Sequence, residues 1–104
     1  MLYYDERVEK QVLALPRTLA VRYLKLTELM VEFGGDLGMP HTKSLGEGLF
    51  ELRLKGQEGI ARVFYCTLVK KRIVMLHSFI KKTDKIPSKE LAIARKRKEE
   101  IQHA

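Results

Sequence analysis

Arginine and lysine side chains that could bind a phosphate group are concentrated in residues 49–82. Arg53 and Arg62 fall in two neighbouring predicted strands, and each guanidinium is a permanent planar cation that matches two phosphate oxygens. A lysine cluster follows the last predicted strand, at Lys81, Lys82 and Lys85. This set of residues suits chemistry on a phosphodiester, because fixed cations stabilise the negative charge that develops around phosphorus.

Cleavage of RNA by its own 2′-hydroxyl also needs a base for the hydroxyl proton and an acid for the leaving 5′-oxygen. The candidates are Glu51, Tyr65, His77 and one of the lysines, whose pKa cationic neighbours can lower. This reaction requires no metal ion and no other cofactor. Each candidate also has a purely structural interpretation. Tyr65 and His77 fall in apolar strand patterns, and Arg53 can pair with Glu51 or Glu47 on the surface.

Three consecutive strands must position these residues. Residues 49–55 alternate between apolar and polar side chains, and residues 60–69 and 73–80 are rich in β-branched and aromatic side chains. A glycine-bounded turn at residues 56–59 and a basic turn at residues 70–72 connect the strands. The sequence therefore predicts an antiparallel meander.

Strand alternation groups some of these side chains by face. The first strand presents its charged residues together, namely Glu51, Arg53 and Lys55. The third strand groups His77, Phe79 and Lys81. The middle strand stays undecided, because both of its faces are otherwise apolar and neither Arg62 nor Tyr65 is assigned to one of them.

Two helices are predicted before this meander. Apolar residues recur at helical spacing after Asp5, at Val8, Val12 and Leu15. Pro16 ends this helix or begins the next. The second helix has a longer apolar stripe, formed by Leu19, Tyr23, Leu26, Met30 and Phe33, and Gly34 and Gly35 end it. We expect the pair to form an antiparallel hairpin that covers the sheet.

The remaining segments are a first strand or frayed end at residues 1–4, a long surface loop at residues 34–48, and a C-terminal helix. Pro87 and Ser88 predict the start of this helix. Its thin apolar stripe consists of Leu91, Ala94 and Ile101. The rest of the helix is highly charged, which favours a solvated face.

Composition sets the limits of these expectations. The chain has 104 residues and a formal net charge of +7, which predicts one domain over residues 1–104 and a polyanionic partner such as nucleic acid. The same charge can also serve solubility alone. A single cysteine, Cys66, excludes an internal disulfide and a multi-cysteine zinc motif, and the three histidines lack metal-ligand spacing. Without a long apolar run or a secretory signal, we expect a cytoplasmic protein with no membrane partner.

Three motifs then stand out: K-x-L-x-x-G-L-F-E-L-R at residues 43–53, A-R-V-F-Y at residues 61–65, and L-H-x-F-x-K-K-T-x-K-x-P beginning at Leu76. They resemble the HigB-like, phage-derived branch of the RelE/ParE superfamily, the toxins of bacterial type II toxin–antitoxin systems. The departures are Phe50, where tryptophan is frequent in that branch, and Ala61, where an aromatic residue is usual.

The resemblance implies a compact sheet with helices packed on one face. With the patterns above, this gives an α+β fold in which a small antiparallel sheet carries a helical hairpin on one face and a C-terminal helix. The implied activity is a metal-independent endoribonuclease, or mRNA interferase, that inhibits translation by cleaving mRNA on the translating ribosome. The implied partner is a cognate helix-turn-helix antitoxin of the HigA kind. The site residues in matching motifs are Arg53, Arg62, His77, Lys81 and Lys82.

Two other functions stay open, as do the oligomeric state and the sequence that is cut. The ParE branch of the same superfamily inhibits DNA gyrase, and a basic RNA-binding module without catalysis would carry the same charge. Further candidates for RNA contact are Lys55 and Lys85 near the meander and Lys89, Arg95, Lys96, Arg97 and Lys98 on the C-terminal helix. That helix either contacts ribosomal RNA or only covers the sheet.

Overall fold

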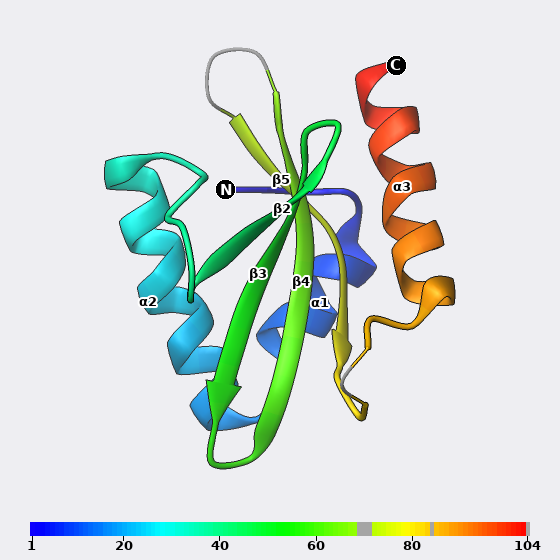
Figure 1. The fold of residues 1–104 in the computed structure, drawn as a ribbon. Coiled ribbons are helices and arrows are strands. Elements are labelled where there is room, and N and C mark those ends of the chain that lie inside the picture. Colours follow the sequence, from blue (N-terminus) through cyan, green and yellow to red (C-terminus); the bar gives the residue numbers. More distant parts are fainter. Residues whose placement is uncertain (69–71, 84, 104) are drawn as a thin grey trace.

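The computed structural model of the protein describes residues 1–68, 72–83 and 85–103. These residues form an α+β fold (Figure 1), as predicted. The elements in chain order are β1 (Leu2–Tyr3), α1 (Glu6–Leu13), α2 (Arg17–Phe33), β2 (Thr42–Gly46), β3 (Leu49–Gly56), β4 (Gly59–Leu68), β5 (Arg72–Ile80) and α3 (Ser88–Gln102). The basic turn predicted at residues 70–72 lies outside the described residues except for Arg72, which begins β5.

The ends of α1 and α2 follow from local sequence. The Asp5 carboxylate accepts a hydrogen bond from the Val8 backbone N–H at 2.9 Å and so caps α1. Pro16 precedes the first turn of α2, and Gly34 ends this helix with a φ of 99° that other residues rarely adopt. The predicted stripe of α2 is buried except for Phe33, which is 69 % exposed. Phe33 is the last helical residue and lies at the edge of the stripe, so the sheet does not cover it.

The five strands of the described residues form one sheet in the order β1-β5-β4-β3-β2. The predicted meander of β3, β4 and β5 is confirmed, because both of its strand pairs are antiparallel. The first strand forms as well, but it pairs with β5 in parallel, with Leu2 opposite Val74. The sheet is therefore mixed, whereas the sequence predicted an antiparallel sheet.

The prediction of an irregular loop over residues 34–48 was wrong for β2. This strand pairs with β3 through Thr42 opposite Leu52, Lys43 opposite Glu51 and Ser44 opposite Phe50. Its residues are mostly polar and show no apolar alternation, so the sequence carries little strand signal. The strand forms because its backbone groups pair with the outer edge of β3, an interaction that local patterns do not report.

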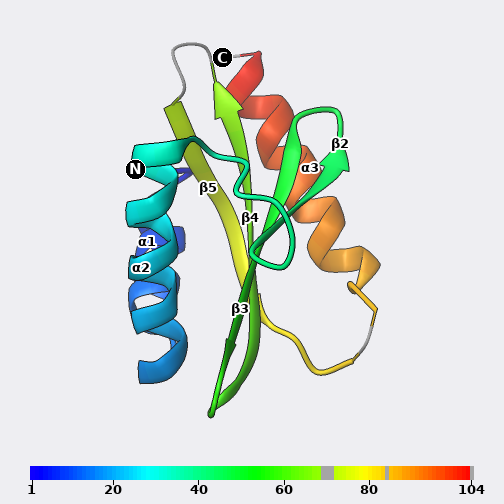
Figure 2. The same ribbon diagram turned by 60° about the vertical axis from the view of Figure 1, so that its left-hand side comes forward.

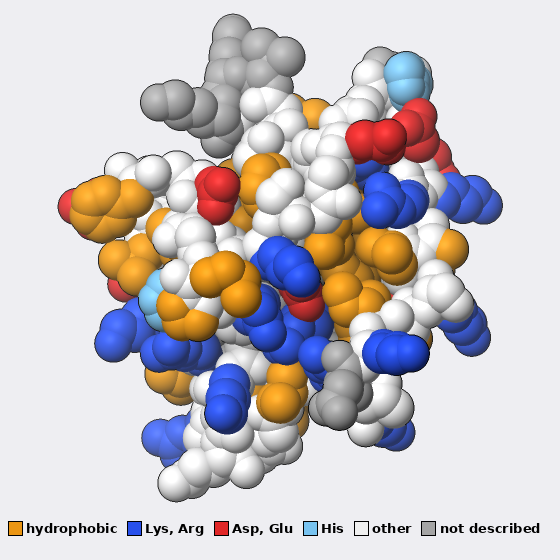
Figure 3. Space-filling view, in the orientation of Figure 1, with side chains coloured by type: hydrophobic (Ala, Val, Ile, Leu, Met, Phe, Trp, Pro, Cys, Tyr) orange, Lys and Arg blue, Asp and Glu red, His pale blue; other side chains and the backbone are white. Residues whose placement is uncertain are grey.

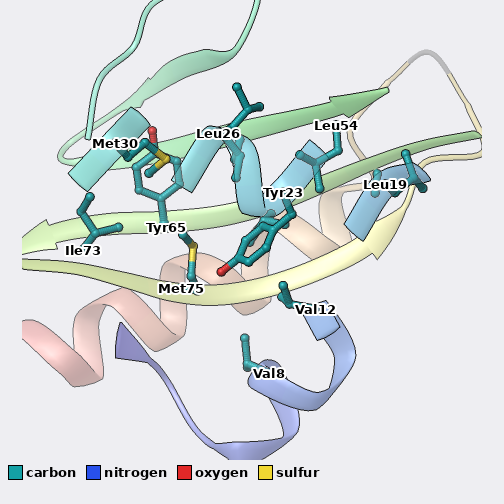
Figure 4. Close-up of a cluster of buried hydrophobic side chains, with 13 residues drawn as sticks. Val8, Val12, Leu19, Tyr23, Leu26, Met30, Leu54, Tyr65, Ile73 and Met75 are labelled. Carbon is teal, nitrogen blue, oxygen red and sulfur yellow. The ribbon is translucent and has the colours of Figure 1, made fainter. Parts of the chain in front are cut away.

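Helices cover both faces of the sheet (Figure 2), with α1 and α2 on one face and α3 on the other. The expectation of helices on a single face was therefore wrong. Figure 4 shows the larger core, where α1 and α2 pack on the inward residues of β3, β4 and β5. Its side chains include Val8, Val12, Leu19, Tyr23, Leu26, Met30, Leu54, Tyr65, Ile73 and Met75.

The smaller core lies beneath α3. Ala94 is fully buried, and Leu91 and Ile101 pack partly buried beside it, which confirms the thin apolar stripe predicted for this helix. The sheet contributes Leu49, Phe64, Cys66, Val74 and Leu76. Cys66 is thus a buried core residue. No helix within the described residues is long and apolar enough to cross a lipid bilayer.

Candidate functional site

The register of the sheet brings most of the predicted site residues to one face. Arg53 of β3 lies directly opposite Arg62 of β4, and Arg62 lies opposite Phe79 of β5. Residues that pair directly across strands point to the same side of a sheet. The structure therefore assigns Arg62, which the sequence left undecided, to the face of Arg53. A second row on this face contains Glu51, Phe64 and His77.

A hollow of about 440 Å³ opens beside the two arginines. The pairing of β2 with β3 ends at Leu52, and the hollow lies beside the part of β3 that follows this residue. Figure 3 shows Lys and Arg side chains gathered near the middle of this side of the molecule. The cations that line the hollow are Arg22, Arg53, Lys55, Arg62 and Lys81. Such a cluster attracts an anion and suits a phosphate group.

Arg62 is buried and paired with Glu51. Its Nε lies 2.5 Å from Oε1 of Glu51, and the two side chains are only 5 % and 4 % exposed. Nε is poorly aligned for a hydrogen bond, whereas Nη1 donates to the Ala61 carbonyl at 3.2 Å. Burial lowers the pKa of the Arg62 guanidinium, Glu51 raises it and Arg53 lowers it. Because arginine stays protonated in proteins, the Arg62 guanidinium remains a cation at the inner side of the hollow, with the Glu51 carboxylate as its counter-ion.

Arg53 is the more accessible of the two arginines. Its backbone N–H donates to the His41 carbonyl at 2.9 Å, and its Nη1 approaches the Met39 sulfur at 3.3 Å. Lys55 is exposed two residues further along β3, and Lys81 is half-buried. The Lys81 N–H donates to the Ile60 carbonyl at 2.7 Å, which extends the pairing of β4 and β5 by one residue. These three cations can therefore reach a ligand in the hollow.

His77 lies on the same face as Arg62, but its side chain is bonded to a residue of α3. Its Nε2 is bonded to the Glu90 carboxylate, and its ring stacks on Phe79 with 6.2 Å between centroids. Its Nδ1 is buried and has no hydrogen-bond partner among the described residues. His77 is not part of the lining of the hollow. The structure thus uses this histidine to fasten the start of α3 to β5.

Tyr65 is not brought to the site. It belongs to the core beneath α1 and α2, on the opposite face from Arg62. Its hydroxyl donates to the Gly35 carbonyl, its ring stacks on Phe50 with 5.4 Å between centroids, and burial raises its pKa. A tyrosine so placed cannot reach a phosphate beside Arg62. Its role is structural, because it joins β4 to the segment that follows α2.

Three other predicted lysines lie apart from the hollow. Lys82 and Lys85 follow the meander and Lys89 lies in the first turn of α3; all three are exposed and none lines the hollow. The Lys85 carbonyl accepts a hydrogen bond from the Thr83 hydroxyl at 3.0 Å. These side chains are free to contact a larger polyanion beyond the hollow.

The cations of α3 divide into two groups, which corrects the prediction of one solvated basic face. Lys96 is exposed and Arg95 is half-buried. Lys98 is buried, and its Nζ donates to the Gln102 side chain at 3.1 Å. Arg97 donates to the Leu76 carbonyl at 2.8 Å and lies over the Tyr4 ring, 4.7 Å from its centroid. Arg97 therefore holds α3 against the sheet, whereas the hydrogen bond of Lys98 lies within α3.

Two ionisable residues that line the hollow, Arg22 and His41, were not among the site residues predicted from the sequence. Arg22 is a half-buried residue of α2, a helix that sequence patterns treat only as a cover for the sheet. His41 was considered only as a metal ligand, although it stands two residues before Lys43, where the first recognised motif begins. Among the described residues, no group of three His, Cys, Asp or Glu side chains could hold a metal ion.

Comparison with known proteins assigns the chain to a family. A search of curated proteins gives no significant match. Residues 10–99, however, match the family described as "Phage derived protein Gp49-like (DUF891)". The match includes α2, every strand of the meander and almost all of α3. Because it covers most of the chain, the protein belongs to this phage-derived Gp49-like family, a toxin-like family related to RelE and ParE.

Proposed function

We propose that this protein is the toxin of a type II toxin–antitoxin system and that it cleaves mRNA as an endoribonuclease on the translating ribosome. The observation that carries this proposal is the basic hollow, in which Arg53, Arg62 and Lys81 converge from three strands or their ends. Membership of a toxin-like family supports the biological role. The HigB-like motifs around these residues support RNA as the substrate.

The proposed reaction is attack of an RNA 2′-hydroxyl on the adjacent phosphorus. Negative charge then increases on the phosphate oxygens, and preformed cations stabilise it without reorganisation. Arg53 and Lys81 are accessible enough to contact these oxygens, while buried Arg62 acts mainly through its charge. The mechanism uses protein cations in the place that a metal ion takes in other nucleases.

The proposal also includes a partner. An antitoxin with a helix-turn-helix domain, of the HigA kind, would bind the toxin and neutralise it. Copurification of this chain with the product of the neighbouring gene tests this part separately from catalysis.

Induced expression in a bacterial host, with mapping of the 5′ ends of cellular mRNA, tests the activity. We expect growth arrest and new 5′ ends inside translated regions. Arg53→Ala and Arg62→Ala should each reduce cleavage by about 10²- to 10³-fold, because each removes one charge that stabilises the transition state. Lys10→Ala is the matched control, since Lys10 is an exposed cation of α1 outside the hollow.

Three outcomes would contradict the proposal or its site. Arrest without new mRNA ends, together with inhibition of DNA supercoiling by the purified protein, would indicate a gyrase inhibitor. Salt-dependent RNA binding without any cleavage would indicate a basic binding module. Full cleavage by folded Arg62→Ala and Arg53→Ala proteins would exclude the hollow as the catalytic site.

A further inference from the structure

We infer that His41 is the general base of the proposed cleavage, an inference that rests on the ribonuclease function proposed above. His41 lines the basic hollow together with Arg53 and Lys81. It belongs to none of the three motifs that resemble the toxin superfamily, and it follows Met39 and Pro40 in the segment between α2 and β2. Its candidacy comes from its position in the fold.

The other proton-transfer candidates are engaged elsewhere. Glu51 is paired with Arg62, His77 is bonded to Glu90, and Tyr65 lies in the core of the opposite face. The charged groups that line the hollow beside His41 are arginines and lysines. Arginine does not release its proton in proteins, and lysine does so only at high pH unless it is strongly perturbed. Within this lining, His41 is the side chain whose ring nitrogens can both accept and donate a proton.

The backbone holds His41 beside Arg53. Thr42 pairs with Leu52, and one residue further out the Arg53 N–H donates to the His41 carbonyl at 2.9 Å. This hydrogen bond continues the register, so His41 is the neighbour of Arg53 at the edge of the sheet. Neighbouring strands lie about 4.8 Å apart. A phosphate held by Arg53 is therefore within reach of the His41 imidazole.

A small hydrogen-bonded network fixes the segment that carries His41. The Thr42 hydroxyl accepts hydrogen bonds from the backbone N–H groups of Leu37 and Gly38, both at 2.9 Å, and donates to Asp36 at 3.2 Å. The His41 N–H donates to the Gly38 carbonyl at 3.0 Å. Thr42 itself is buried. A general base must be held in place in this way, because proton transfer depends on a short and directed contact.

In the proposed step, the neutral His41 imidazole takes the proton of the 2′-hydroxyl while the 2′-oxygen forms a bond to phosphorus. The bond between phosphorus and the 5′-oxygen breaks, and the 5′-oxygen takes a proton from solvent water. The products are a 2′,3′-cyclic phosphate and a free 5′-hydroxyl. His41 then returns its proton to solvent, so the enzyme is regenerated.

The test compares cleavage rates of wild-type and His41→Ala proteins on one mRNA, both free and bound to purified bacterial ribosomes. We expect a loss of about 10²- to 10⁴-fold, the usual contribution of a general base. Added imidazole should restore part of the rate of His41→Ala, because the substitution leaves space for it.

His103→Ala is the control, because His103 is an exposed histidine at the end of α3, away from the hollow. Binding of the same RNA with a 2′-deoxy substitution at the cleaved position should be nearly unchanged in His41→Ala. Cleavage by His41→Ala within about threefold of wild type would overturn the inference and leave the ribonuclease function standing. A loss that added imidazole does not rescue would also overturn it. No cleavage by the wild-type protein would instead refute the proposed function itself.

Discussion

Arg53 and Arg62 lie directly opposite each other on β3 and β4, with both side chains on the same face of the sheet. Glu51 pairs with Arg62 and is buried with it. Like charges that face each other across two strands destabilise a sheet. We therefore expect the two guanidinium groups to lower stability where they face each other, to the extent that Glu51 does not offset their repulsion, as is common at functional sites.

The first prediction concerns this facing pair. Arg53→Met keeps the aliphatic stem and removes the charge, so we expect the free energy of unfolding to stay the same or to rise by up to about 0.5 kcal/mol. RNA binding should weaken at the same time. Urea unfolding and RNA titration measure the two effects. A loss of stability above about 1 kcal/mol would show that Arg53 serves the fold instead.

The second prediction concerns the buried pair of Glu51 and Arg62. Glu51→Ala leaves the guanidinium buried without its counter-ion and should cost about 3–5 kcal/mol of stability. Replacing both residues, as in Glu51→Leu with Arg62→Met, should recover most of this loss. Urea unfolding of the single and double variants gives the answer, with Glu28→Ala on the exposed surface of α2 as the control. Additive losses in the double variant would contradict the prediction.

The third prediction concerns alkaline pH. Burial raises the pKa of Tyr23 and Tyr65 above 10.0 and that of Cys66 above 9.0. The folded protein thus holds these protons more tightly than the unfolded chain. This contribution to stability is fully present below about pH 9. It begins to decline as the pH rises past the unfolded-state values of 9.0 and 10.0, and it declines further as the pH approaches the raised pKa values of the folded state.

Urea unfolding between about pH 8 and about pH 11 tests this dependence. In Tyr65→Phe, the lost hydrogen bond to Gly35 should cost about 1 kcal/mol at neutral pH, and the difference from wild type should shrink as the pH rises. A difference that stays constant over this range would show that the Tyr65 proton is not held more tightly in the folded state.

The fourth prediction separates the cations of α3. Arg97→Ala removes the hydrogen bond to the Leu76 carbonyl and the contact with Tyr4, and should cost about 1.5–3 kcal/mol. Lys96→Ala should change stability by less than about 0.5 kcal/mol, because Lys96 is exposed. Thermal or urea unfolding measures both. Equal effects of the two substitutions would mean that α3 is held to the sheet in another way.

The fifth prediction concerns His77. Because it binds Glu90, His77→Ala should lower stability and loosen the start of α3. We expect the folded variant to cleave RNA at a rate within about tenfold of wild type, because His77 is not the proposed proton-transfer group. This rate should be well above the rate of His41→Ala. Hydrogen exchange of residues 88–92 and a cleavage assay measure the two effects. A stable variant without activity would return His77 to the list of catalytic candidates.

Local patterns in the sequence determined the elements that are long and periodic. The stripe of α2 from Leu19 to Met30, the helical spacing after Asp5 and the three strands of the meander follow from spacing and residue type within a few turns of chain. The motif at residues 43–53 located the basic region that holds Arg53. These features depend on interactions between near neighbours, which sequence patterns record well.

Tertiary structure decided which residues share the site. Strand pairing puts Arg62 on the same face as Arg53 and puts Tyr65 in the core on the opposite face. The docking of α3 brings Glu90 into contact with His77. None of these outcomes is visible in period-2 alternation, because each depends on the register between distant segments or on a helix docked from the far end of the chain.

The hollow itself is the clearest case. Its lining comes from distant segments: a helix contributes Arg22, a loop contributes His41, and the end of the last strand contributes Lys81. The hollow lies beside the part of β3 beyond Leu52, which β2 does not pair with. The chain by itself determined that the protein is a basic α+β domain with arginines in its strands. Folding determined which charges stand together, because only contacts between distant segments fix their positions.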